Sequence, residues 1–159
     1  MSTARLEEAL RVIGPMAQLF GQTEAASKHG WHHTGDVGYL DEDGYLFIVD
    51  RLKDMIITGG FNVYSAEVEQ ALMQHPAVRD CAVVGLPDDK WGERVTAEIE
   101  ASAEVQPDEL VAFVKARIGS VKAPKQVELW QELPRSRLGK VLKADVQTQL
   151  LHDQGRRRP

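Results

Sequence analysis

The sequence has a single cysteine and no long apolar run, and each shortage excludes a class of protein. One thiol, Cys81, cannot form an internal disulfide, and its neighbours DCAVVGL predict a small buried side chain. No stretch has the length of apolar sequence that a membrane span needs. The segment MSTARLEEALRV lacks the apolar centre of a signal peptide, so we expect a cytoplasmic protein without a membrane span.

Clustered positive charge is missing as well. The 159 residues carry a formal net charge of −5, whereas a nucleic-acid surface needs gathered Lys and Arg. We therefore expect no nucleic-acid partner. The one basic run, Arg156 to Arg158, is interpreted as part of a flexible tail over residues 152–159. A hydrophobic content of 43% with 27% charged residues predicts a packed core.

What the sequence does contain is a succession of short strand and helix patterns, which predicts the α+β class. A helix over 3–12 and a short strand over 16–20 are expected first. Two alternating apolar runs around Asp41 to Gly44 predict a β-hairpin. A short strand is expected over 54–58, and a small three-stranded sheet is expected from residues 78–87, 93–101 and 125–130.

Three further helices follow from apolar spacing and end signals. Ser65 is a candidate N-cap for a helix through Gln74, with Val68, Leu72 and Met73 facing inward. Pro107 suits the first position of the second helix, and Gly119 its end. Leu142, Val146 and Leu150, spaced by four residues, predict the third.

The run TGDVGYLDEDGYLFIVDRLKDMIITGGFNVYSAEVEQAL resembles the AMP-forming acyl-CoA synthetases, part of the adenylate-forming superfamily. The resemblance covers residues 30–151 and includes VVGLPDDKWGE, KAPKQV and LPRSRLGKVLK. Several ordered motifs at family-like spacing are more specific than one pattern. The resemblance implies a two-step reaction that uses ATP, Mg²⁺ and coenzyme A. A carboxylate attacks ATP to give an acyl-adenylate and pyrophosphate, and the coenzyme A thiol then displaces AMP.

The resemblance also implies an internal deletion. FGQTEA resembles a motif near the end of the family's large N-terminal domain, and WHHTGD resembles the motif at its border with the small C-terminal domain. Only residues 25–33 separate QTE from TGD, where the family has several dozen residues, and no TSGTTGxPKG-like phosphate loop occurs. We therefore predict a remnant of the large domain over 1–36 and a nearly complete C-terminal domain over 37–151.

Lys140, in LGKVLK, matches the family's catalytic lysine. An ammonium on a long stem can reach the α-phosphate and the attacking carboxylate together, and it offsets the negative charge that develops between them. On residue type alone, an exposed surface lysine beside a helix start is the better explanation of Lys140, and it is the flanking PRSRLGK pattern that favours descent from the family's catalytic lysine. Lys143, three residues on, is expected to lie within the last helix and to point into solvent.

Four residues match the family's nucleotide ligands. Asp36 matches the ribose ligand, because a carboxylate can accept hydrogen bonds from both vicinal hydroxyls, and Arg51 matches its supporting arginine. A turn acid and a surface ion pair are the alternatives for these two. Thr23 and Glu24 match residues that meet the AMP phosphate and Mg²⁺, although a carboxylate ligand needs a formed pocket beside it.

Two further motifs match moving or coenzyme-lining parts of the family. Lys53 matches the hinge about which the small domain swings between two poses. Gly59, Gly60, Phe61 and Asn62 match the loop that lines the pantetheine tunnel, where glycine lets the thiol arm pass close to the backbone. A solvated lysine and a tight turn are the alternatives.

Three functions follow from these matches. The first is a truncated acyl-CoA synthetase for a fatty or other carboxylic acid, inactive alone because the phosphate loop and acyl pocket are missing. The second is a nucleotide- or coenzyme A-binding or regulatory module that self-associates or acts in trans with a separate large domain. The third is an enzyme that is complete as written, which would have to hold ATP without pocket walls.

Overall fold

The structure is a computed structural model that describes residues 27–28, 31–32 and 34–157. The chain divides into two compact units, residues 1–53 and 54–159. The helix predicted over 3–12 and the strand predicted over 16–20 lie outside the described residues. The predicted domain borders after residues 36 and 151 remain predictions.

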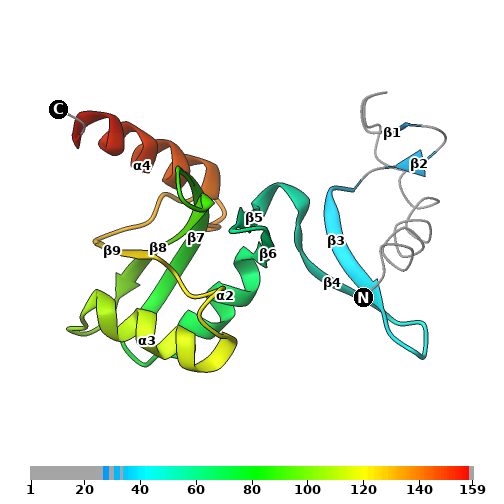
Figure 1. Cartoon of the computed structure of the whole chain (residues 1–159), viewed down its shortest axis with the longest axis horizontal. Coiled ribbons are helices and arrows are strands. Elements are labelled where there is room, and N and C mark those ends of the chain that lie inside the picture. The colour runs from blue at the N-terminus through cyan, green and yellow to red at the C-terminus, as the bar shows by residue number, and fades with distance from the viewer. Residues whose placement is uncertain (1–26, 29–30, 33, 158–159) are drawn as a thin grey trace. The chain divides into compact units, whose positions relative to one another are not determined.

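The described part of the first unit consists of two antiparallel strand pairs. β1 (Ser27–Lys28) pairs with β2 (Trp31–His32), and β3 (Asp36–Leu40) pairs with β4 (Leu46–Arg51). The second pair is the predicted hairpin (Figure 1). Its turn is held by Asp41, whose Oδ1 accepts the N–H groups of Asp43 and Tyr45 at 3.0 and 2.9 Å. Such Asx turns favour hairpin reversal.

The second unit is built on a sheet whose central strand is β8 (Gly92–Ala101). β7 (Val78–Asp88) runs antiparallel along its whole length, and β9 (Gln126–Trp130) runs parallel along its other side. On that same side, β5 (Met55–Thr58) meets β8 where Thr58 is opposite Gly92, and β6 (Phe61–Tyr64) pairs with β5. The three predicted strands are present, and the β5–β6 hairpin enlarges the sheet to five strands.

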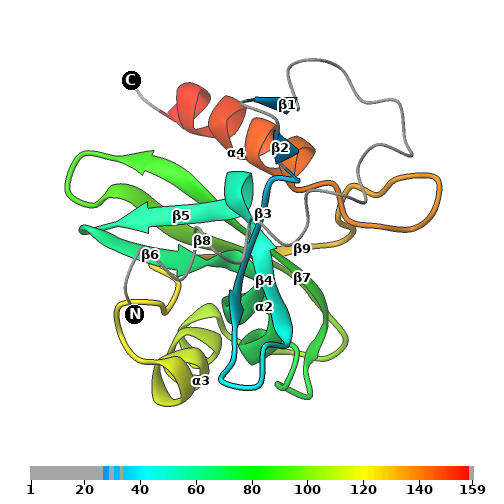
Figure 2. The ribbon, with the colours of Figure 1, turned by 90° about the vertical axis from the view of Figure 1, so that its right-hand side faces the viewer.

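Helices cover both faces of this sheet (Figures 1 and 2). α2 (Ser65–Leu72) and α3 (Pro107–Ile118) pack on one face, and α4 (Lys143–Arg157) packs on the other. Burial of apolar side chains on two faces supplies most of the stability of such a layered unit. The α+β class and the three helices of this unit are confirmed. None of the described helices has the length and apolar character needed to cross a lipid bilayer.

The helix ends differ in detail from the prediction. Ser65 is the first residue of α2 and is buried, while Tyr64 takes the capping position without a side-chain cap. The helix stops at Leu72, so Met73 lies outside it and is 48% exposed. Pro107 and Gly119 mark α3 as predicted, and Gly119 has a φ of +87°. α4 starts at Lys143, after Leu142, and continues to Arg157.

Candidate functional site

The TGD motif forms a turn that carries Asp36 into the first pair of the β3–β4 hairpin, opposite Arg51. Gly35 has a φ of +74°, and Thr34 Oγ1 accepts the N–H of Asp36. Arg51 Nε lies 2.9 Å from Asp36 Oδ1. Within the described residues, Asp36 Oδ2 takes part in no hydrogen bond or ion pair. The pair therefore stabilises the hairpin. It also presents an oriented carboxylate oxygen that can accept a hydrogen bond from a hydroxyl group.

Lys53 follows this hairpin in the 3-10 turn η3 (Leu52–Asp54) and is exposed. It is the last residue of the first unit, so it stands at the junction where a hinge is predicted. Thr23 and Glu24, the predicted phosphate and magnesium ligands, lie outside the described residues. The structure thus brings Asp36 and Arg51 together among the predicted nucleotide ligands.

Gly59 and Gly60 form the turn between β5 and β6, with φ of +57° and +82°. Phe61 and Asn62 follow on β6 with exposed side chains, and Phe61 is 59% exposed. Glycine is required here because other residues rarely adopt two successive positive φ values. The four residues predicted to line the pantetheine path therefore sit together at one end of the second unit's sheet.

A depression of about 310 Å³ lies beside this turn, lined by Thr58, Gly59, Phe61, Trp91, Ser120, Val121 and Lys125. Gly59 N–H donates to the Trp91 carbonyl at 2.8 Å, which joins the turn to the β7–β8 connection. Lys90 and Lys125 place their ammonium groups 5.0 and 5.6 Å from the Trp91 ring. Partial burial and the nearby Lys115 lower the pKa of Lys125. Sequence reasoning missed Trp91 and Lys125, although they stand in the WGE and KAPK motifs.

Lys140 is carried by a compact turn over residues 134–142, here named the lysine turn. Arg135 and Val141 form an isolated antiparallel bridge at its base. Ser136 N–H donates to the Lys140 carbonyl at 2.8 Å, and Lys140 N–H donates to Ser136 Oγ at 3.2 Å. The Lys140 side chain is exposed. The turn thus holds the backbone of Lys140 while leaving its ammonium accessible.

Lys143 differs from the expectation of a solvated side chain. It is the first residue of α4, is half-buried, and lies 2.9 Å from Glu69 Oε1 and 2.7 Å from Ser65 Oγ. Both partners belong to α2, on the opposite face of the sheet. Glu69 Oε1 also accepts the N–H of Val83 on β7. Lys143 is therefore a structural group that joins the two helix layers, and Lys140 is the accessible lysine of this motif.

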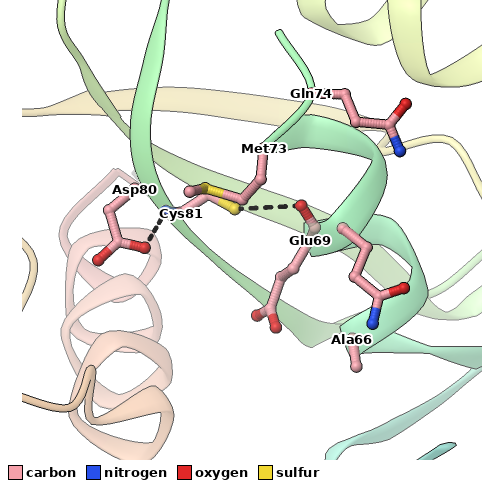
Figure 3. Close-up of a pocket in the computed structure, with 7 residues that line it drawn as sticks. Ala66, Glu69, Met73, Gln74, Asp80 and Cys81 are labelled. Atoms are coloured by element: carbon pink, nitrogen blue, oxygen red, sulfur yellow. Dashed lines mark hydrogen bonds between the residues drawn. The ribbon is translucent and has the colours of Figure 1, made fainter.

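A second depression, of about 590 Å³, lies between α2 and the start of β7 (Figure 3). Figure 3 shows the Cys81 sulfur directed toward the Glu69 carbonyl, 3.7 Å away, and Asp80 accepting the Cys81 N–H. Cys81 is buried, as predicted, and burial together with the carboxylate of Glu69 raises the pKa of its thiol. A thiol kept protonated is a poor nucleophile, so its role here is packing.

The family model that matches this chain is the AMP-binding enzyme C-terminal domain, over residues 67–140. A 2-succinylbenzoate–CoA ligase of Bacillus cereus is 44% identical over 124 residues, which are 78% of this chain and 26% of that protein. A medium/long-chain-fatty-acid–CoA ligase of Mycobacterium tuberculosis is 46% identical over 144 residues, 85% of this chain and 25% of that protein. The chain thus spans about a quarter of the length of these curated relatives.

Solved structures give the same result. The o-succinylbenzoate CoA synthetase of Bacillus subtilis, in complex with its acyl-adenylate intermediate, superposes with a TM-score of 0.73 at 39% identity, over 80% of this chain and 26% of that one. A fatty acyl CoA synthetase of Mycobacterium tuberculosis superposes with a TM-score of 0.65 at 45% identity, over the same shares. The chain therefore carries an AMP-binding enzyme C-terminal domain and belongs with the C-terminal parts of the adenylate-forming acyl-CoA ligases.

Proposed function

We propose that this chain supplies the C-terminal half of an acyl-CoA synthetase site, for a fatty or other carboxylic acid, and does not complete the reaction alone. In this proposal Lys140 is the catalytic group of the adenylation step. The observation that carries the proposal is the lysine turn, which fixes the Lys140 backbone while its side chain remains exposed. An accessible ammonium at a fixed position can stabilise the charge that develops at the α-phosphate of ATP.

Asp36 and Arg51 are the proposed ribose ligands. Arg51 orients the Asp36 carboxylate from the neighbouring strand at 2.9 Å, so Asp36 needs little reorganisation to accept a hydroxyl. Charge-assisted hydrogen bonds of this kind are about twice as strong as neutral ones. Thr23 and Glu24 are the proposed ligands of phosphate and Mg²⁺, on the sequence match alone.

The depression beside Gly59 is the proposed path of the coenzyme A pantetheine arm. Gly59 offers backbone without a side chain, and the apolar faces of Phe61 and Trp91 line the same depression. Lys90 and Lys125 flank Trp91 with positive charge, which suits the anionic end of coenzyme A. ATP, which leaves as AMP, coenzyme A and Mg²⁺ are the proposed cofactors of the complete site.

The test is pyrophosphate exchange from ATP in the presence of a panel of carboxylic acids. The full chain alone is expected to give no exchange above background. It is then mixed with the large domain of the Bacillus cereus 2-succinylbenzoate–CoA ligase, expressed without its C-terminal quarter, and 2-succinylbenzoate is supplied. Exchange that requires both proteins supports the proposal, whereas exchange by the chain alone with any acid overturns it.

A module that acts in trans is the second candidate function, and the β3–β4 hairpin favours it. Its exposed apolar side chains include Tyr39, Phe47 and Ile48, and the Tyr39 and Phe47 rings stack with centroids 5.2 Å apart. Tyr39 and Phe47 share one face of the hairpin, and stacked aromatic rings exposed in this way are typical of a protein-contact surface. Pyrophosphate exchange in the mixture is expected of both candidate functions, so sedimentation of the chain alone, which detects self-association, tests the second.

A further inference from the structure

Glu100 is a charged residue in the interior of the second unit, with only 3% of its surface exposed. It lies on β8, and both of its oxygens are engaged. Oε1 accepts the N–H of Leu133 at 2.6 Å and a hydrogen bond from Arg135 Nη2 at 2.9 Å. Oε2 accepts from Arg79 Nε and Nη2 at 3.1 and 2.8 Å. A carboxylate buried at this depth requires such pairing.

Arg135 connects this buried carboxylate to the lysine turn. Besides Glu100, its guanidinium contacts Asp80 Oδ2 at 2.8 Å through Nη1. The same nitrogen donates to the carbonyl of Gly139 at 3.2 Å. Gly139 immediately precedes Lys140 and has a φ of +81°. A planar guanidinium with several fixed donors is suited to hold three acceptors at once.

These contacts reach the start of the lysine turn and its tip. Leu133 precedes the lysine turn and is fixed directly by Glu100, while Gly139 near its tip is fixed through Arg135. Asp80 is itself oriented, because its Oδ1 accepts the Cys81 N–H at 2.8 Å (Figure 3). The backbone of Lys140 is thus connected through Arg135 to β7 and β8.

We propose that Glu100, Arg135 and Asp80 are positioning residues that hold the Lys140 backbone in the orientation used for adenylation. The inference rests on the proposed function for the role of Lys140. The network of Glu100, Arg135 and Asp80, here named the clamp, is a property of this chain alone. None of the three side chains is required to touch substrate. Their action passes through the Gly139 carbonyl and the Leu133 N–H.

The ionisation of Glu100 agrees with this arrangement. Burial alone would raise the pKa of Glu100, but the Leu133 N–H and the guanidinium groups of Arg135 and Arg79 outweigh it and hold that pKa below its usual range. The carboxylate is therefore charged at neutral pH and can accept all four hydrogen bonds.

Amide hydrogen exchange of the full chain, followed residue by residue by NMR, tests the clamp. Glu100→Gln keeps the shape and removes the charge, and Arg135→Gln removes the guanidinium. Each is expected to raise the exchange rates of the Ser136, Gly139 and Leu142 amides by about tenfold or more, since a hydrogen bond to a charged group is lost. The amides of β7 and β8 remain within twofold of the wild type. Glu67→Gln is the matched control, because it breaks the 2.6 Å pair of Glu67 with Lys122 and leaves the turn untouched.

Two results overturn the proposal. One is that the amide hydrogen-exchange rates of the lysine turn are unchanged in both variants. The other is a rise of all amides in step, which makes the network a global stability element. The double variant is expected to raise exchange by less than the product of the single effects, since both act through one contact. Fully multiplicative effects contradict a shared route.

A separate assay distinguishes this inference from the proposed function. In the reconstituted mixture with the Bacillus large domain, Glu100→Gln is expected to lower kcat of pyrophosphate exchange about tenfold, with KM for ATP within twofold. Arg135→Lys, which keeps the positive charge, is expected to retain part of the kcat that Arg135→Gln loses. Failure of the wild-type mixture to react overturns the proposed function. The amide hydrogen-exchange rates of the chain alone still decide whether the clamp exists. An active mixture in which Glu100→Gln matches the wild type overturns the positioning role.

Discussion

At the scale of single residues, two lysines three positions apart have opposite roles. Among the described residues, Lys140 forms its hydrogen bonds through its backbone and its side chain is exposed, whereas the side chain of Lys143 reaches Glu69 and Ser65. We expect Lys140→Ala to leave the free energy of unfolding within about 0.5 kcal/mol of the wild type and to abolish any exchange in the reconstituted mixture. Lys143→Ala is expected to lower the free energy of unfolding by about 1–2 kcal/mol, because a half-buried ion pair is lost. Urea unfolding measures both, and equal losses would contradict the assignment.

Glu98 is the least satisfied buried residue in the described part of the second unit. It is 0% exposed, and neither carboxyl oxygen has a hydrogen-bond partner among the described residues. Burial, and secondarily the carboxylate of Glu128 opposite it on β9, raises its pKa from an ordinary value of 4.5 to about 8. The folded protein therefore holds a proton that the unfolded chain releases at lower pH.

This gives a pH dependence of defined sign. Between pH 4.5 and about 8 the unfolded chain binds fewer protons at this position, so the contribution of Glu98 to stability falls as pH rises. The Glu98→Gln side chain cannot titrate. The free energy of unfolding of this variant is expected to exceed that of the wild type by a few kcal/mol at pH 9 and to differ little near pH 5. Thermal unfolding across this range measures it. Glu104→Gln, at an exposed position, is the control, and a variant curve parallel to the wild type contradicts the prediction.

At the scale of the element, the β5–β6 turn is specified by two glycines with different surroundings. A side chain at Gly60 would meet no atom within 4 Å, but one at Gly59 would lie 3.2 Å from the Trp91 ring. Both have positive φ, so Gly60→Ala is expected to cost about 1 kcal/mol. Gly59→Ala should cost more and also shift the Trp91 indole signal in an NMR spectrum. If Gly60→Ala shifts that signal equally, Gly59 does not determine the packing of Trp91.

The elements that local patterns specify were predictable. The β3–β4 hairpin follows from its turn residues, and α3 follows from Pro107 and Gly119. β6 was missed, although Gly59-Gly60 between two apolar runs is a hairpin signal. The assignment of Ser65 as an N-cap was wrong because its hydroxyl is buried and bonded to Lys143, a contact 78 positions away that no local pattern contains.

The candidate site shows the same division between local and distant information. The pairing of Asp36 with Arg51 follows from the hairpin register, and the family motifs singled out Lys140. Trp91 beside Gly59, and Glu100 behind the lysine turn, depend on how β5, β8 and the 131–142 segment meet. Residues that support a site from another strand carry no sequence signature of their own.

At the scale of the whole molecule, the proposed functional residues are divided between two units. Asp36, Arg51 and Lys53 belong to the first unit, and the Gly59 turn and Lys140 belong to the second. In the part of the chain that the structure describes, both clusters of buried apolar residues lie within the second unit, between Ile56 and Leu150. Its α2 and α4 layers are also joined internally, by Lys143 and Glu69. The second unit therefore has the contents of an independently folding domain.

A fragment of residues 54–159 should accordingly fold without the first unit. We expect a cooperative unfolding transition with Tm within about 5 °C of the transition of the full chain, because neither apolar cluster of the described residues is cut. Calorimetry of both proteins measures it, and a fragment ending at residue 130 is the control, since it removes Leu133, Val146 and Leu150 from one cluster. An unfolded 54–159 fragment beside a folded full chain would mean that the first unit contributes to the core. In that case Asp36 and Lys140 would depend on one folding unit, and a hinge at Lys53 would be untenable.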